Sequence, residues 1–189
     1  MQSKSHFPRD YAKNPFIERL QEVKKMLGSR ILFWELPWNR KAVGVTLMLV
    51  FLPNILSIVN LTTPGGVNLH TFQVAIFLAA SLLGPIGGLL SGLIGSLVSA
   101  LILSNPYLMI GNAVLGFFTG WFLRRGIHPL FAVWMAFCLQ LLWLIPTDYF
   151  LAGLSLSFIQ NLVLMLFLSN TIWAIVAAWL SGPLKRWLA

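Results

Sequence analysis

From residue 42 to residue 189 the chain carries only five charged side chains: Arg124, Arg125, Asp148, Lys185 and Arg186. The whole sequence is 58% hydrophobic and 10% charged, and its mean hydropathy is +0.81. A soluble domain carries about 25% charged residues, because its surface must face water. The sequence therefore predicts an integral, multi-pass protein of the cell membrane.

All of the remaining charges lie in residues 1–41, which hold nine of the 13 Lys and Arg residues and four of the five Asp and Glu residues. Within this segment Phe16, Leu20 and Leu27 recur at helical spacing, with charged residues between them. Such a helix lies on a membrane surface or packs on the cytoplasmic end of the membrane domain. We therefore predict a cytoplasmic amphipathic arm at 1–41 and a transmembrane domain at 42–189.

The apolar part of the chain divides into six segments of roughly the length that crosses a bilayer, about 20 residues. Residues 67–83 are short for a span, but the basic pairs at 40–41 and 124–125 decide the count. With six helices every basic pair lies on the cytoplasmic side, as the positive-inside rule requires. The prediction is an all-α membrane protein with six transmembrane helices and cytoplasmic N and C termini, with spans at 42–60, 67–83, 86–104, 107–123, 130–151 and 158–182.

The net charge of +8 fits this orientation, and we assign it to the cytoplasmic face rather than to nucleic-acid binding. The lipid bilayer is then the first partner that the composition implies.

Glycines interrupt the third apolar segment at a spacing of four, a spacing that places them on one face of a helix. In lipid, helices associate through close approach of their backbones, and small residues permit that approach. The sequence therefore predicts helix-packing surfaces in the third and fourth segments, made by Gly84, Gly88, Gly92, Gly95, Gly116 and Gly120.

The same stretch resembles the substrate-binding S components of energy-coupling factor (ECF) vitamin transporters. The resemblance rests on a G-P-x-x-G-x-x-x-G-x-x-G pattern that starts at Gly84, a turn at Pro106 and a G-x-x-x-G from Gly116 to Gly120. It covers about 42–189. It implies an S-component-like bundle that captures a vitamin or a related small aromatic or heterocyclic molecule. It also implies a membrane coupling subunit and ATPase subunits as partners in an ABC importer.

Candidate substrate contacts are polar or aromatic side chains at the outer ends of the predicted helices. Asp148 is the sharpest, because it is the only acid after residue 41 and an ionisable group within a membrane segment is functional by default. The alternative is a solvated helix end. A carboxylate beside tryptophan suits a cationic or amino-substituted ring, such as thiamine or its pyrimidine precursor, among others. The predicted substrate-binding residues are Asp148, Trp143, Asn112, His70, Asn161, Gln140 and Tyr149.

The sequence carries no phosphate-binding loop, paired carboxylates, metal-spaced Cys/His cluster or nucleophile beside a base. We therefore expect no enzyme activity, no catalytic residues, no metal and no cofactor. A second interpretation remains open: a structural membrane protein of the rod-shape or cell-wall assembly type, with no substrate. In that case the outer polar residues would form a packing network.

Overall fold

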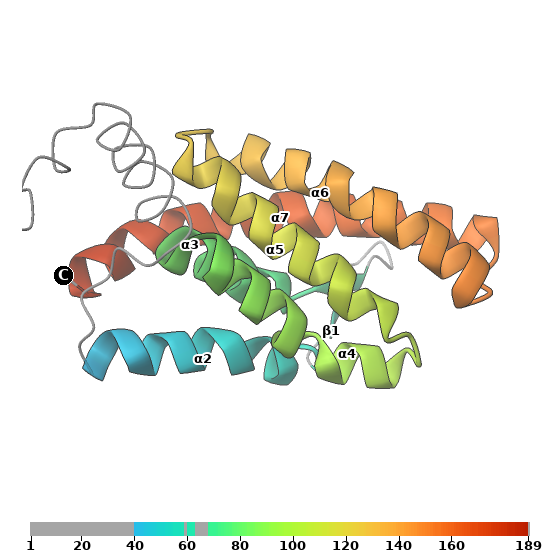
Figure 1. The fold of residues 1–189 in the computed structure, drawn as a ribbon, viewed down its shortest axis with the longest axis horizontal. Coiled ribbons are helices and arrows are strands. Elements are labelled where there is room, and N and C mark those ends of the chain that lie inside the picture. Colours follow the sequence, from blue (N-terminus) through green and yellow to red (C-terminus); the bar gives the residue numbers. More distant parts are fainter. Residues whose placement is uncertain (1–39, 59, 63–67, 189) are drawn as a thin grey trace, which may run out of the picture.

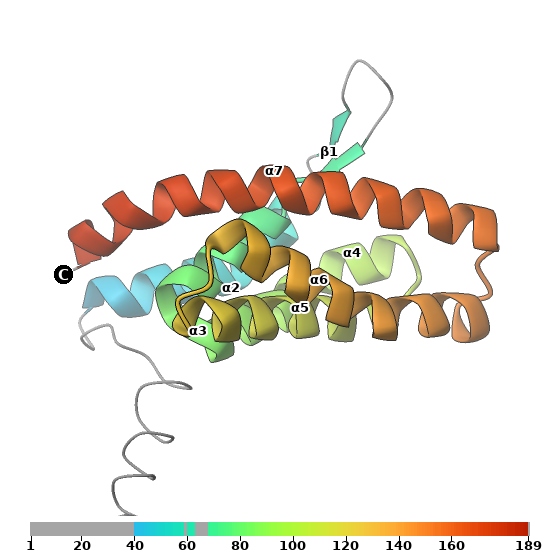
Figure 2. The ribbon, with the colours of Figure 1, turned by 90° about the horizontal axis from the view of Figure 1, so that it is seen from above.

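A computed structural model describes residues 40–58, 60–62 and 68–188. The helices lie roughly along one long axis, and a two-stranded hairpin lies beside the last of them (Figures 1 and 2). By length and composition, three described helical stretches could cross a membrane: Gln73–Ile102, Pro129–Leu151 and Leu156–Leu188. The described part of the chain is thus an α-helical membrane protein, and its elements are α2 (Arg40–Leu56), β1 (Asn60–Thr62), β2 (Asn68–His70), α3 (Gln73–Gly95), α4 (Leu97–Ile102), α5 (Tyr107–Arg124), α6 (Pro129–Pro146), the π-helical turn η2 (Thr147–Leu151) and α7 (Leu156–Leu188).

Helix α3 breaks in the middle, at Gly84. The backbone there has φ 77° and ψ −162°, a conformation that essentially only glycine adopts without strain. A Cβ on Gly84 would also lie 3.0 Å from Nε of Arg124. Pro85 then begins the second leg, where its fixed φ and missing N–H suit a first helical position. The break turns one apolar run into two legs that pack on each other.

The second leg of α3 makes its closest contact with α5. A Cβ placed on Gly88 would overlap the backbone carbonyl of Gly116, and one on Gly92 would overlap the carbonyl of Asn112. A Cβ on Gly120 would lie 2.6 Å from the backbone nitrogen of Pro85. The two backbones therefore touch along the helix, as small residues allow in a membrane.

Helix α2 packs on the other side of the α3–α4 junction. A Cβ on Gly95 would lie 2.5 Å from Cγ of Pro53. The Asn54 side chain donates to the carbonyl of Ile94 at 2.9 Å and accepts from the amide of Val98 at 3.0 Å. One side-chain amide thus bridges two backbone groups on either side of the α3–α4 junction. Gly84 is a hinge and Gly95 faces α2, so the predicted glycine stripe serves three different purposes.

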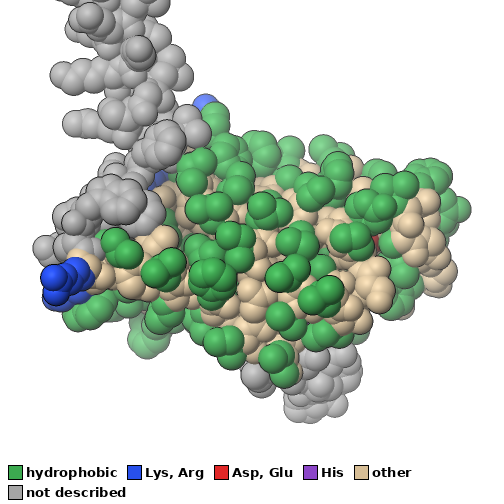
Figure 3. Space-filling model, turned by 60° about the horizontal axis from the view of Figure 1, so that its bottom comes forward, with side chains coloured by type: hydrophobic (Ala, Val, Ile, Leu, Met, Phe, Trp, Pro, Cys, Tyr) green, Lys and Arg blue, Asp and Glu red, His purple; other side chains and the backbone are tan. Residues whose placement is uncertain are grey.

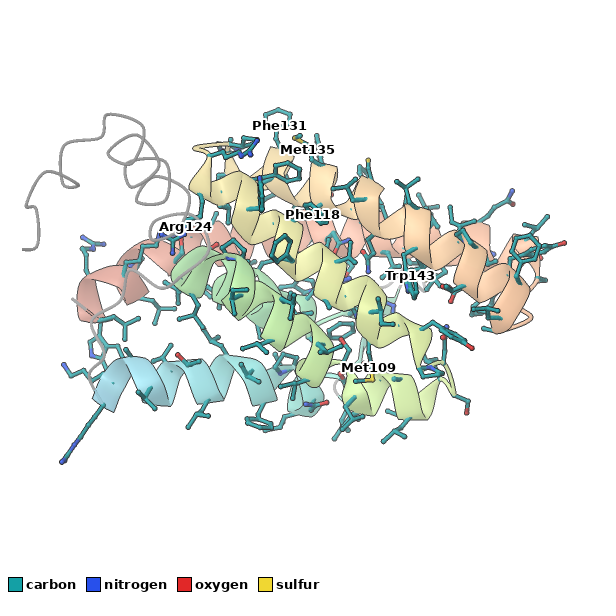
Figure 4. The ribbon with its side chains drawn as sticks, in the orientation of Figure 1. Met109, Phe118, Arg124, Phe131, Met135 and Trp143 are labelled. Atoms are coloured by element: carbon teal, nitrogen blue, oxygen red, sulfur yellow. The ribbon has the colours of Figure 1, made fainter. Side chains whose placement is uncertain are left out.

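The described basic residues gather at one end of the bundle. The start of α2 and the ends of α5 and α7 lie together there (Figures 1 and 4). Nζ of Lys41 lies 5.2 Å from the ring centroid of Trp187, and Arg124 and Lys185 line one cavity together. The face seen in Figure 3 carries Lys and Arg toward this end and hydrophobic or uncharged side chains elsewhere.

The six predicted spans differ from the observed helices in several places, and the predicted span at 86–104 divides into the second leg of α3 and α4. Residues 67–83 do not form one helix: Asn68–His70 is strand β2, which pairs antiparallel with β1, and the first leg of α3 begins at Gln73. At 1.5 Å per residue, the leg from 73 to 83 is about 16 Å long, half of a bilayer core. Helix α2 also ends at Leu56 rather than near residue 60.

The last helix extends past its predicted end at 182. Pro183 lies inside α7, and the helix continues to Leu188. Leu188 is buried in the hydrophobic core, and Lys185 and Arg186 lie where the negative end of the helix dipole favours cations. These contacts outweigh the backbone hydrogen bond that proline removes. Of the predicted arm, 1–39 lies outside the described residues, and Arg40 and Lys41 begin α2.

The α3–α5 contact predicts how the protein responds to one added methyl group. Gly88→Ala should lower the temperature of thermal unfolding in detergent, because overpacking costs about 1–3 kcal/mol. Gly44→Ala is the matched control, since Gly44 also lies within a helix and has no atom within 4 Å of its Cβ position. Equal unfolding temperatures for the two variants, measured by scanning fluorimetry, would contradict the close contact.

Candidate functional site

The end of the bundle opposite the basic residues holds a cavity of about 570 Å³. Its wall comes from β2, the α4–α5 turn, the η2–α7 connection and the first turns of α7. Side chains of mixed character line it, among them His70, Ser104, Asn105, Leu108, Phe158 and Asn161. Pockets for small molecules commonly measure 300–1,000 Å³ and combine apolar walls with a few polar groups. The cavity therefore has the size and lining of a ligand site.

A smaller void of about 40 Å³ continues the cavity toward the centre of the bundle. His70, Leu103, Leu108 and Leu162 line both spaces, so the two adjoin. The void is otherwise lined mainly by apolar side chains, with the amides of Asn112 and Gln140 and the hydroxyl of Ser99. A space of this size holds about one water molecule or the edge of a larger ligand.

A chain of hydrogen bonds fixes the amides beside this void. Nε2 of Gln140 donates to Oδ1 of Asn112 at 3.0 Å, and Nδ2 of Asn112 donates to Oγ of Ser96 at 2.8 Å. The Ser96 hydroxyl donates to the carbonyl of Gly92 at 2.6 Å. Gln140 and Asn112 are 1% and 2% exposed. Oε1 of Gln140 is buried without a hydrogen-bond partner among the described residues.

Asp148 lines neither the cavity nor the smaller void. It lies behind the cavity wall and forms hydrogen bonds to residues of that wall. It is 2% exposed, and its Oδ1 accepts from Nδ2 of Asn105 at 2.7 Å. Its backbone carbonyl accepts from the amide of Leu154 at 2.9 Å. Asn105 and Leu154 do line the cavity. The only acid of the described residues thus ties two separate wall segments to η2.

Two predicted aromatic contacts also lie away from the cavity lining. Nε1 of Trp143 donates to the carbonyl of Tyr107 at 3.1 Å, which holds α6 against the start of α5 (Figure 4). Tyr149 is 42% exposed and its ring packs against Phe150 at 4.9 Å between centroids. Of the seven predicted substrate contacts, the structure brings His70, Asn112, Gln140 and Asn161 around one continuous space.

The comparison with protein-family models identifies the chain. Residues 40–184 match the model described as "ECF-type riboflavin transporter, S component". The chain belongs to this S-component family. It is accordingly a multi-pass membrane protein, the substrate-binding subunit of an ECF transporter. No curated protein and no solved structure matches the chain significantly.

His70 is the titratable side chain that this S component places in the cavity lining. It lies in β2, outside the membrane-spanning helices, and burial lowers the pKa of its imidazole. The imidazole is therefore neutral at physiological pH and offers one donor and one acceptor. Its backbone amide donates to Oγ of Ser169 at 3.1 Å, and that hydroxyl donates to Oε1 of Gln73 at 2.6 Å. Strand β2 is thus fixed to α7 and α3.

Several lining residues were not among the predicted substrate contacts. Ser104, Asn105 and Phe158 belong to short connections or first turns, where no helical periodicity marks the inward direction. Asn105 stands directly before the Pro106 turn, and a short polar pair at such a turn was the available signal. Within the described ranges, no group of three or more His, Cys, Asp or Glu side chains could hold a metal ion.

The role of Asp148 as a tie predicts which substitution matters. Asp148→Ala should lower the unfolding temperature, because it leaves Asn105 Nδ2 buried without an acceptor at a cost of about 1–3 kcal/mol. Asp148→Asn keeps an acceptor oxygen of the same shape and should unfold close to the wild type. Tyr149→Ala, next along the same turn and exposed, is the control. If Asp148→Asn is as damaging as Asp148→Ala, the negative charge rather than the hydrogen bond holds the turn.

Proposed function

We propose that this S component captures riboflavin from outside the cell and delivers it to an ECF-type importer. The observation that carries the proposal is the cavity of about 570 Å³ at the end of the bundle farthest from its basic residues. The family model, which names riboflavin for its members, supports the choice of substrate.

The lining suits the two chemically different parts of riboflavin. The isoalloxazine ring is flat and apolar on its faces, and Leu108, Phe158 and Leu162 supply apolar surface. The ribityl chain carries hydroxyl groups, which the side chains of His70, Asn105 and Asn161 can meet with neutral hydrogen bonds. Riboflavin is uncharged near neutral pH, and a cavity lined by amides and a neutral imidazole requires no counter-charge. This lining favours riboflavin over the cationic ring that Asp148 suggested.

The orientation that we propose places both termini and the basic end in the cytoplasm. The positive-inside rule supports it, because Arg40, Lys41, Arg124, Arg125, Lys185 and Arg186 would then all lie on the cytoplasmic side. In the six-helix arrangement that we propose, the first leg of α3 corresponds to the second helix and the second leg to the third helix. The cavity then opens toward the outside of the cytoplasmic membrane.

Delivery across the membrane requires partners that this chain does not supply. By analogy with ECF transporters, we propose a membrane coupling subunit and ATPase subunits, with this chain acting as a binding protein and not as an enzyme. The division into an arm at 1–41 and a membrane domain at 42–189 belongs to the same proposal. The alternative of a cell-wall structural protein gains no support from the family match and leaves the cavity without an occupant.

Binding of riboflavin to the purified protein tests the proposal. Titration followed by quenching of flavin fluorescence should show saturable, one-to-one binding. Asn161→Leu should weaken it about tenfold, because one hydrogen bond lost with a buried partner costs about 1–2 kcal/mol. Tyr149→Phe, outside the cavity lining, should bind as the wild type does. A wild-type protein that is folded and shows no saturable riboflavin binding would overturn the proposal.

A further inference from the structure

The inner void ends on an amide whose orientation is fixed by a chain of hydrogen bonds. This series of hydrogen bonds ends at the backbone carbonyl of Gly92. A carbonyl can only accept, so the Ser96 hydroxyl must donate to it. The Ser96 oxygen then accepts from the Asn112 amide nitrogen, which leaves the Asn112 oxygen to accept from Gln140. Each of these hydrogen bonds therefore excludes one alternative orientation of the hydroxyl or amide that forms it.

These hydrogen bonds also fix the orientation of the Gln140 amide. Its nitrogen is committed to Asn112, so its oxygen is the group left over, and that oxygen is buried without a partner among the described residues. An unmet buried acceptor destabilises the folded state, so a donor should occupy its vicinity in the working protein. Gln140 lines the void that adjoins the larger cavity.

We infer that Gln140 Oε1 is the specificity-determining acceptor for an N–H donor on the leading edge of the substrate. The inference rests on riboflavin being the substrate. The imide edge of riboflavin carries one N–H group, and this edge is narrow enough to enter a space of about 40 Å³ that cannot admit the whole ring. The ring then passes between Leu103, Leu108 and Leu162, and the ribityl chain remains in the wider cavity near Asn161.

The orientation of the amide gives the site its selectivity. A substrate that presents an N–H group satisfies Oε1, whereas one that presents only carbonyl or N-methyl groups leaves it unmet. Had the Asn112 and Gln140 amides been free to rotate, the site would accept either kind of edge. Ser96 therefore acts as a positioning residue through Asn112, without contact to the substrate.

The test compares riboflavin with 3-methylriboflavin, in which a methyl group replaces the imide hydrogen. Wild-type protein should bind riboflavin about tenfold or more tightly than the methylated compound. Gln140→Met, which keeps the volume and removes the acceptor, should weaken riboflavin about tenfold and change the affinity for 3-methylriboflavin by no more than about twofold. Ser96→Ala should reduce the preference for riboflavin in the same direction. Asn161→Leu, in the outer cavity, should weaken both compounds and preserve their ratio.

The outcomes separate this inference from the proposed function. Equal wild-type affinity for the two compounds would overturn it and leave riboflavin as the substrate. So would a Gln140→Met variant that binds riboflavin and retains the wild-type ratio, because the void would then hold water rather than the imide edge. If Gln140→Met does not fold, the wild-type ratio and Ser96→Ala decide. Absence of riboflavin binding by the wild type would overturn both proposals.

Discussion

The backbone contact between α3 and α5 is the constraint on which the rest of the structure depends. Lipid gives helices no hydrophobic reason to associate, so the bundle relies on close packing and internal hydrogen bonds. Gly88 against Gly116 brings the two backbones together, and Gly92 then lies against Asn112. That register sets the Asn112 side chain within 2.8 Å of Ser96 and presents it to Gln140 of α6. The floor of the cavity is therefore a product of helix packing.

Charge is divided along the bundle in a way that matches a neutral substrate. The described Lys and Arg residues gather at one end, and the cavity at the other end is lined by amides, hydroxyls, an imidazole and apolar groups. Asp148, the one acid in the described residues, is turned inward to hold Asn105. Its hydrogen bond keeps the α4–α5 turn and the η2–α7 connection in place around the opening. In the proposed function, stability and recognition thus depend on different polar residues that lie within a few turns of each other.

Sequence alone predicted the membrane class and the small-residue contacts, because composition, periodicity and glycine spacing report directly on burial, and its resemblance to S components indicated the family. It predicted that His70, Asn112 and Asn161 lie at the depth of Asp148, and these three, with Gln140, line two adjoining spaces. Its spans at 67–83 and 86–104 implied a reversal between them, which the structure has at Gly84, but it assigned Gly84 itself to the packing stripe, because the spacing of four does not show which glycine adopts a positive φ. It placed Asp148 in the cavity, because the sequence does not show whether the carboxylate of a lone acid contacts a ligand or a neighbouring amide. Strand β2 was missed because three residues carry no periodicity.

The central claim is that one continuous space, opposite the basic end, holds riboflavin with its imide edge inward. An experimental structure of the purified protein with riboflavin bound tests it most directly. The account predicts flavin density between Leu108, Leu162 and Phe158, with the imide nitrogen within hydrogen-bond distance of Gln140 Oε1 and the ribityl chain near Asn161. Flavin density at the basic end beside Arg124 and Lys185 would contradict it.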